Sequence, residues 1–256
     1  MKYSEWEKWY NKILEDFAFS KDDDEKTANI LNEILDKQGF IKLENVLNNL
    51  HNDNLAIHKS CSNKSDIKNF IVFGAGPSLK KHIELVKKKC LVEDYILIVA
   101  DGATSALLEE NIVPDIIVTD LDGNIDDLML ANDLGSVFIL HAHGHNLENI
   151  LKYTKKLKKV LGTTQSKPLS NLYNFGGFSD GDRAVFLALA FGGEKIVLAG
   201  MDFGIMTTKY SRPNLTSEIA EADEVKQKKL KYAEELVEWV KNNENVEIIN
   251  LSQDLD

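Results

Sequence analysis

The 256-residue sequence has few cysteines, an excess of negative over positive charge, and no long apolar run. Its two cysteines, Cys61 and Cys90, are far apart and form no CxxC pair, which argues against a disulfide framework or a structural zinc site. The formal net charge of −11 argues against nonspecific binding of nucleic acid, which needs a basic surface. No run reaches membrane-spanning length, and the N-terminus is charged and amphipathic, unlike the apolar core of a signal peptide. The sequence therefore predicts a cytoplasmic protein that binds neither nucleic acid nor membrane.

The remaining composition is typical of a soluble globular protein, with 43% apolar and 28% charged residues. From Glu5 to Leu35 the apolar residues recur at helical spacing in two segments, which are separated by a polar break. We therefore expect an N-terminal helical region over residues 1–65. Trp6 and Trp9 are predicted to be packing anchors there.

After residue 65 the pattern changes to short Val, Ile and Leu runs, most of them separated by amphipathic segments. Apolar runs that alternate with helices predict a mainly parallel sheet covered by helices on both faces. We therefore predict an α/β catalytic domain over residues 66–256. In such sheets, ligands bind beyond the carboxyl ends of the strands. The runs are NFIVF, YILIVA, DIIVT, SVFIL, KVLG, EKIVLA and VEIIN.

The first run ends in FGAGPSL, a glycine-containing turn. Gly74 and Gly76 allow close approach of a ligand to the backbone, and Pro77 and Ser78 are placed to open a helix, whose exposed N–H groups can bind phosphate. The third glycine of the dinucleotide-binding fingerprint is missing. A tight strand–helix turn capped by Ser78 therefore stays open as the alternative to a phosphate site.

Carboxylates end the next two runs. Asp101 and Gly102 follow YILIVA, and Asp120 and Asp122 follow IIVT. Residues two apart in an extended chain point the same way, so Asp120 and Asp122 could present their carboxylates together. Two close carboxylates suit a Mg²⁺ ion that bridges substrate phosphates. The alternative is a turn-forming aspartate pair at DGN.

The segment ADG…VPDIIVTDLDGN resembles the ADGG…PD…GD.DS pattern of thiamin pyrophosphokinases. Together with FGAGPSL, HAHGHN, GGFSDGDRAV and AGMDFG, it is similar to the archaeal 6-hydroxymethyl-7,8-dihydropterin pyrophosphokinases, from about Phe70 to the last predicted strand. The resemblance implies a Rossmann-like, thiamin pyrophosphokinase-like fold and Mg²⁺-dependent transfer of diphosphate from ATP to the pterin, with release of AMP. It also implies a place in tetrahydromethanopterin- or folate-type pterin biosynthesis. DLDGN and the histidines depart from the thiamin enzymes, which argues against thiamin as the acceptor.

HAHGHN places His141, His143 and His145 at alternating positions after SVFIL. Alternation could put all three on one face, as in a metal site, although no cysteine accompanies them. The resemblance implies a loop near the substrate phosphates or the metal. A buried, hydrogen-bonded histidine is the alternative for each position. His143 or a metal-site aspartate could assist loss of the hydroxyl proton, and no residue is fixed as the base.

GGFSDGDRAVFLALAFGG predicts a glycine-rich loop that enters a buried helix capped by Ser179 or Asp180. Asp182 and Arg183 then lie in the first turn, and Asp182 is a candidate ligand-binding residue. Arg183 is the candidate phosphate clamp, because a guanidinium group can bind two oxygens at once. The alternative is an ion pair with Asp180 or Asp182. AGMDFG supplies a further strand-end carboxylate, Asp202, for the metal or the acceptor ring.

Lysines are frequent in VKQKKLKYAEELVEWVK, whose apolar residues recur at helical spacing. This predicts a helix with its lysines on a solvated face. Lys209 and Arg212 lie in a polar segment that could close over triphosphate, which we keep as a minor alternative.

The preferred function is a diphosphotransferase that uses ATP and a pterin acceptor. Asp120 and Asp122, with Asp101 beside them, would hold Mg²⁺, while Arg183 and the glycine-containing turn would hold phosphate oxygens. Gly102, His145, Asp182 and Asp202 complete the predicted ligand site. Two alternatives stay open: a nucleotide-sugar glycosyltransferase, because motility-associated transferases share GxGPSL features, and a non-catalytic nucleotide or metal sensor. The sequence does not fix whether the chain forms a homo-oligomer.

Overall fold

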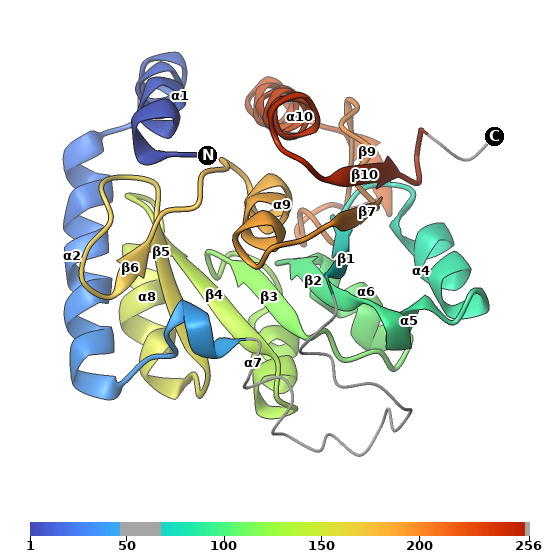
Figure 1. Cartoon of the computed structure of the whole chain (residues 1–256), viewed down its shortest axis with the longest axis horizontal. Coiled ribbons are helices and arrows are strands. Elements are labelled where there is room, and N and C mark those ends of the chain that lie inside the picture. The colour runs from blue at the N-terminus through green and yellow to red at the C-terminus, as the bar shows by residue number, and fades with distance from the viewer. Residues whose placement is uncertain (47–67, 254–256) are drawn as a thin grey trace.

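The computed structural model describes residues 1–46 and 68–253. Its centre is a sheet of eight strands in the order β10-β7-β1-β2-β3-β4-β5-β6. Every neighbouring pair in this sheet is parallel, and helices cover both faces (Figure 1). The predicted α/β fold with a mainly parallel sheet is therefore confirmed. The strands are β1 (Asn69–Phe73), β2 (Ile96–Ala100), β3 (Ile116–Thr119), β4 (Val137–Ala142), β5 (Val160–Thr164), β6 (Leu172–Tyr173), β7 (Lys195–Ala199) and β10 (Glu247–Asn250).

The long apolar runs form strands because the two faces of the sheet are both buried. In β1, Phe70 and Val72 join the core that includes α9 and α10, whereas Ile71 and Phe73 join the core against α4 and α6. Strands covered on both faces have no polar side, so their sequences show no alternation. The helices are α1 (Tyr3–Phe17), α2 (Lys21–Gln38), α4 (Leu79–Lys88), α5 (Leu91–Asp94), α6 (Ala103–Glu109), α7 (Ile125–Asp133), α8 (Leu147–Tyr153), α9 (Asp180–Ala190) and α10 (Glu224–Asn243), with a 3₁₀ turn at Thr154–Lys156.

The two N-terminal helices join the core in different ways: α2 lies along the β4–β5 side of the sheet, whereas α1 lies farther from the strands (Figure 1). Trp6 and Tyr10 of α1 are buried in the core that also contains α9 and α10. Leu31 and Leu35 of α2 are buried against β4, β5 and α8. The predicted helices of this region are thus confirmed. The predicted boundary between residues 65 and 66 lies outside the described residues and stays a prediction.

A small antiparallel pair, β8 (Met206–Thr208) and β9 (Ile219–Glu221), follows β7 and is not predicted by the sequence. The segment after β8 lies close to the start of α6. A Cβ atom added to Gly102 would lie 1.7 Å from the carbonyl oxygen of Tyr210, so only glycine allows this approach. The segment therefore borders the carboxyl edge of the sheet.

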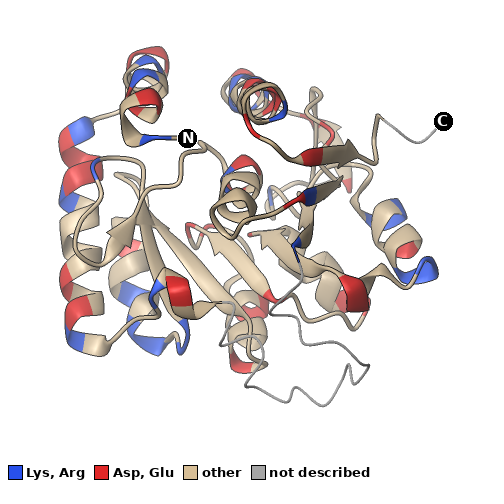
Figure 2. Ribbon diagram, viewed as in Figure 1, with Lys and Arg blue, Asp and Glu red and all other residues tan. Residues whose placement is uncertain are grey.

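Charged residues lie mainly on the outer helices and loops, and the central strands carry few of them (Figure 2). Within residues 1–46 and 68–253, no helix combines the length and the apolar character that a membrane crossing requires.

Candidate active site

A cavity lies at the carboxyl edge of the sheet, beyond the ends of β1, β2, β3, β4 and β7 and beside the start of α9. Parallel strands bring their carboxyl ends to one edge, so residues distant in sequence meet there. The structure brings most of the predicted site residues to this cavity: Gly74, Gly76, Pro77, Asp101, Gly102, Asp120, Asp122, His143, His145, Arg183 and Asp202.

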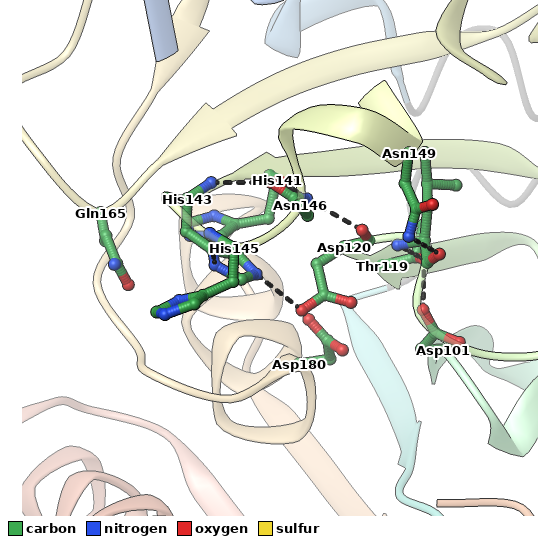
Figure 3. A network of polar contacts seen from close by, with 12 residues as sticks. Asp101, Thr119, Asp120, His141, His143, His145, Asn146, Asn149, Gln165 and Asp180 are labelled. Atoms are coloured by element: carbon green, nitrogen blue, oxygen red, sulfur yellow. Dashed lines mark hydrogen bonds and ion pairs between the residues drawn. The ribbon is translucent and has the colours of Figure 1, made fainter. Parts of the chain in front are cut away.

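Four aspartates form an acidic cluster in the cavity: Asp101, Asp120, Asp122 and Asp180. Each offers a carboxylate oxygen, and these oxygens lie within 4.8 Å of one another. Asp101 follows β2, Asp120 and Asp122 follow β3, and Asp180 opens α9 beside Asp120 (Figure 3). The sequence predicted the first three, whereas Asp180 was considered only as a helix cap or an ion-pair partner. Its place in an SDGD segment after two glycines was the available signal.

Burial and the crowding of like charges shift the pKa values in the acidic cluster. Burial, followed by the charges of Asp120 and Asp122, raises the pKa of Asp101 well above its usual value. Asp122 is more exposed, and partial burial together with the charge of Asp120 raises its pKa to about 6. Burial and the charges of Asp120 and Asp101 also raise the pKa of Asp180. A divalent cation among these groups would relieve their repulsion.

Unpaired oxygens in the cluster point to a cation. Oδ1 of Asp101 and Oδ1 of Asp120 are buried and have no hydrogen-bond partner among the described residues. Oδ1 of Asp180 also lacks a hydrogen bond within this part of the chain, and Nη1 of Arg183 lies 3.6 Å from it. Buried polar atoms without partners are costly, and carboxylate oxygens are the ligands of Mg²⁺ and Ca²⁺. The residues present therefore fit a divalent metal ion.

His143 is hydrogen-bonded to the acidic cluster (Figure 3). Its Nε2 lies 2.9 Å from Oδ2 of Asp120, and its Nδ1 accepts a hydrogen bond of 3.2 Å from the backbone N–H of His145. Nε2 therefore carries the proton and donates a hydrogen bond to the carboxylate of Asp120. Burial opposes the charged form of Asp120, but its contact with His143, together with Asp122 and the charge of Arg183, outweighs burial and lowers the pKa of Asp120.

The three histidines lie in a row but have different surroundings. The ring centroids of His141 and His143 are 6.0 Å apart, and those of His143 and His145 are 5.8 Å apart. His141 is buried, its Nδ1 lies 3.1 Å from the hydroxyl of Thr163, and burial lowers its pKa well below the usual value. Among the described residues, the group arranged to hold a metal contains only aspartates. The geometry thus favours the hydrogen-bonded alternative for His141.

Arg183 lies in the cavity wall and is almost completely buried. Its Nη2 donates to Oε1 of Gln165 at 3.0 Å, and its Nη1 pairs with Asp180. The predicted ion-pair alternative is therefore present, in a position that also borders the cavity. Gln165 was not predicted as a site residue.

A buried carboxylate from α2 supports Gln165. Oδ2 of Asp24 accepts hydrogen bonds from Nε2 of Gln165 and from the hydroxyl of Tyr10, both at 2.7 Å. Its Oδ1 accepts one from the backbone N–H of Gly144, also at 2.7 Å. Asp24 therefore connects α1 and α2 to the histidine loop and, through Gln165, to Arg183.

The glycine-containing turn after β1 is filled by protein atoms. A Cβ atom on Gly76 would lie 2.1 Å from Oδ2 of Asp202, and the backbone N–H of Ser78 donates to the same oxygen at 3.1 Å. The start of α4 thus already binds a carboxylate. The turn leads directly into α4 with Ser78 as its N-cap residue, as the alternative expected, but the Ser78 side chain makes no capping hydrogen bond; its hydroxyl lies 3.1 Å from Nδ1 of His82.

Asp182 lies outside the cavity and is fully buried. Its carboxylate accepts hydrogen bonds from the backbone N–H groups of Phe178, at 2.5 Å, and Ser179, at 2.8 Å. Ser179 and Asp182 form a capping box, which confirms Ser179 as the cap of α9. The geometry gives Asp182 a structural contact in place of the expected ligand contact.

Two lysines of α10 line the cavity, which the sequence did not predict. Lys226 and Lys229 face it from the first turns of the helix, so the prediction of a solvated face is wrong for these two. Lys209 and Arg212 do not line the cavity. They pair instead with Glu218, at 2.8 Å, and with Asp223.

Fold and site together define a Rossmann-like α/β protein with an acidic cluster, whose residues fit a divalent cation, at the ligand edge of its sheet. The chain matches the model of the family described as 6-hydroxymethylpterin diphosphokinase MptE-like over residues 41–208. It therefore belongs to this family, and the resemblance seen in the sequence motifs is confirmed.

Three archaeal relatives carry the name 6-hydroxymethyl-7,8-dihydropterin pyrophosphokinase. The protein of Methanothermobacter thermautotrophicus is 47% identical, over 97% of this chain and 99% of its own. That of Methanocaldococcus jannaschii is 46% identical, over 97% of this chain and 100% of its own. That of Pyrococcus furiosus is 43% identical, over 98% of this chain and 100% of its own. The chain thus matches these relatives over nearly their full length.

A solved structure, the MAf glycosyltransferase from Magnetospirillum magneticum AMB-1, superposes with a TM-score of 0.45. It is 15% identical and covers 84% of this chain and 40% of the glycosyltransferase chain. A similarity this weak carries no argument about fold or activity.

Proposed function

We propose that the chain transfers diphosphate from ATP to the hydroxymethyl group of 6-hydroxymethyl-7,8-dihydropterin. The observation that carries the proposal is the acidic cluster beside Arg183, in a chain of the MptE-like family. The hydroxymethyl oxygen forms a bond to the β-phosphorus of ATP. The bond from that phosphorus to the oxygen of the α-phosphate breaks, AMP leaves, and the hydroxyl proton is released. The expected setting is cytoplasmic pterin biosynthesis of the tetrahydromethanopterin or folate type.

The acidic cluster is the proposed site of Mg²⁺. Mg²⁺ is usually held by one or two carboxylates together with substrate phosphates, which matches Asp120 and Asp122 with Asp101 and Asp180 beside them. When bound, Mg²⁺ supplies neutralisation of the charge on the phosphate oxygens.

The side chains of the protein position the reactants. Arg183 is held by Gln165 and Asp180, and its planar guanidinium is suited to phosphate oxygens at the cavity wall. Both ring nitrogens of His143 are engaged, so we infer that it orients Asp120 and does not receive the hydroxyl proton. Phosphoryl transfer depends mainly on such positioning and on charge stabilisation.

An assay of AMP release with different acceptors tests the proposal. We expect AMP and pterin diphosphate to form with the pterin, no AMP to form with thiamin, and nucleotide sugars to remain unconsumed. Binding of ATP and Mg²⁺ without AMP release in the presence of the pterin would favour a nucleotide sensor instead.

The metal assignment is tested with D120N and D122N, which keep side-chain size and remove charge. We expect turnover to fall by about 100-fold or more, because losses of about 10–100-fold already follow from changes to groups that only support a metal ligand. D126N, which changes an exposed aspartate on α7, serves as the control. Unchanged activity of D120N and D122N at limiting Mg²⁺ would rule out the assignment.

A further inference from the structure

Lys226 lies in the first turn of α10, which packs against α9 (Figure 1). Asp223 caps this helix by accepting a hydrogen bond of 2.8 Å from the backbone N–H of Lys226. The cap holds the backbone at the point from which the Lys226 side chain reaches the cavity. The capped first turn of α10 therefore fixes the backbone position of Lys226.

The ammonium group of Lys226 is near the acidic cluster but makes no ion pair with it. Burial, followed by the charge of Lys229, lowers the pKa of Lys226, and the charges of Asp122 and Asp180 offset only part of this. Within the described residues, the Lys226 side chain has neither a hydrogen bond nor an ion pair. A partly buried ammonium without a partner is costly unless a ligand supplies one.

The other cations of the cavity are already engaged. Arg183 contacts Gln165 and Asp180. The Lys229 ammonium lies over aromatic rings, 5.9 Å from the centroid of Phe19 and 5.8 Å from that of Phe178. Lys226 is thus the cavity cation that, within the described chain, is left to meet a ligand.

A cation on one wall and carboxylates on the other suit a ligand that binds both, and a phosphate chain with its metal ion does so. An ammonium group offers three donors and binds phosphate as a point charge. We propose that Lys226 binds phosphate oxygens of ATP from the α10 wall of the cavity. The inference rests on the proposed use of ATP and assigns a ligand contact to a helix outside the strand-end motifs.

A purely electrostatic role can be separated from phosphate binding. If Lys226 only offset the charge of the acidic cluster, its loss would remove no contact to the nucleotide. Loss of a nearby positive charge should instead strengthen the binding of a bare cation to the cluster. The two roles thus predict different effects on nucleotide and on metal.

The test compares K226M and K226R with K231M, a control that changes an exposed lysine of α10 outside the cavity. Calorimetry measures binding of α,β-methylene-ATP with Mg²⁺, an analogue that cannot release AMP, and of Mn²⁺ alone. We expect K226M to bind the analogue about 10-fold more weakly or worse. Mn²⁺ affinity should be unchanged or higher, K226R should retain most of the analogue affinity, and K231M should match the wild type.

Wild-type affinity of K226M for the analogue would overturn the inference. So would parallel losses of analogue and Mn²⁺ affinity with a lower melting temperature, because they would indicate a structural role. If the wild type binds the analogue but forms no AMP from ATP and the pterin, the proposed function fails. The expected K226M result would then still support Lys226 as a phosphate-binding residue.

Discussion

Arg183 is held by two contacts that a lysine cannot reproduce together. Its planar group reaches Gln165 and Asp180 at once, whereas lysine keeps the charge but loses the fork of donors. We expect R183K to fold and to lose about 100-fold in kcat, the order of loss found when one stabilising donor is removed. The measurement is made at saturating ATP and Mg²⁺, so that weaker binding is not mistaken for slower chemistry.

The matched control for R183K is R212K, because Arg212 pairs with Asp223 outside the cavity. We expect R212K to retain wild-type turnover. Wild-type turnover in R183K as well would restrict Arg183 to a structural ion pair.

His82 should make stability depend on pH. Its buried Nδ1 accepts a hydrogen bond of 3.0 Å from the backbone N–H of Gly200, and burial lowers its pKa. Below the usual pKa of about 6.5, the unfolded chain takes up a proton that the folded chain excludes, so the free energy of unfolding falls as the pH falls. Above that pKa both states are neutral and the effect vanishes. The slope can reach about 1.4 kcal/mol per pH unit.

Denaturant titrations of the wild type and H82N between about pH 5 and pH 8 measure this dependence. The asparagine oxygen can accept the Gly200 hydrogen bond but does not titrate, so the H82N curve should be flatter. His141, whose pKa is also lowered, contributes equally to both proteins. Identical slopes would show that His82 is not the responsible group.

At the residue scale, the sequence was informative where chemistry follows directly from strand ends. Asp101, Asp120 and Asp122 could be predicted because each follows an apolar run, and parallel strands place such ends together. Asp24 and Gln165 could not be predicted, because their roles depend on a hydrogen bond between distant parts of the chain. No local pattern carries that information.

At the scale of elements, apolar runs predicted the long strands well because burial on both faces leaves one simple signal. β8 and β9 have three residues each and mixed polarity, so they gave no comparable signal. The amphipathic pattern predicted α10 but put all its lysines in solvent. Periodicity cannot show that the first turns of a helix extend over a cavity, where Lys226 and Lys229 lie.

Asp24 links α2 to three other segments through hydrogen bonds with Tyr10, Gly144 and Gln165, and its replacement tests that link. In D24N, one carboxylate oxygen becomes an amide donor that faces the donors of Tyr10, Gln165 or Gly144. Leaving a buried group unsatisfied costs about 1–3 kcal/mol, so we expect a loss of that size in the free energy of unfolding. We also expect lower kcat/KM, because Gln165 no longer holds Arg183 in one orientation.

Urea titration and steady-state kinetics measure the two effects of D24N. D22N, which changes an exposed aspartate of the same helix, is the control and should differ little from the wild type. Wild-type kinetics in a destabilised D24N would show that the link is structural only.

At the scale of the whole molecule, the N-terminal helices share the core of the sheet. Trp6 is fully buried there, and its Nε1 donates to the backbone oxygen of Gln165 at 2.7 Å. We therefore expect one cooperative unfolding transition. Tryptophan fluorescence, which reports on Trp6 and Trp9 of α1 and Trp239 of α10, should give the same midpoint as circular dichroism. Two separate midpoints would mean that the helical region predicted for residues 1–65 folds independently.

The order of the strands has a consequence for synthesis on the ribosome. β1 lies between β2 and β7, and β7 is made roughly 120 residues after β1. At about 5–20 residues per second, one edge of β1 would wait roughly 6–24 s for its partner. An unpaired apolar edge is prone to associate with other chains. Until β7 emerges, the nascent chain should therefore need chaperones, or should have to collapse slowly, to avoid association. Ribosome-bound chains that end before residue 195 should be the aggregation-prone ones.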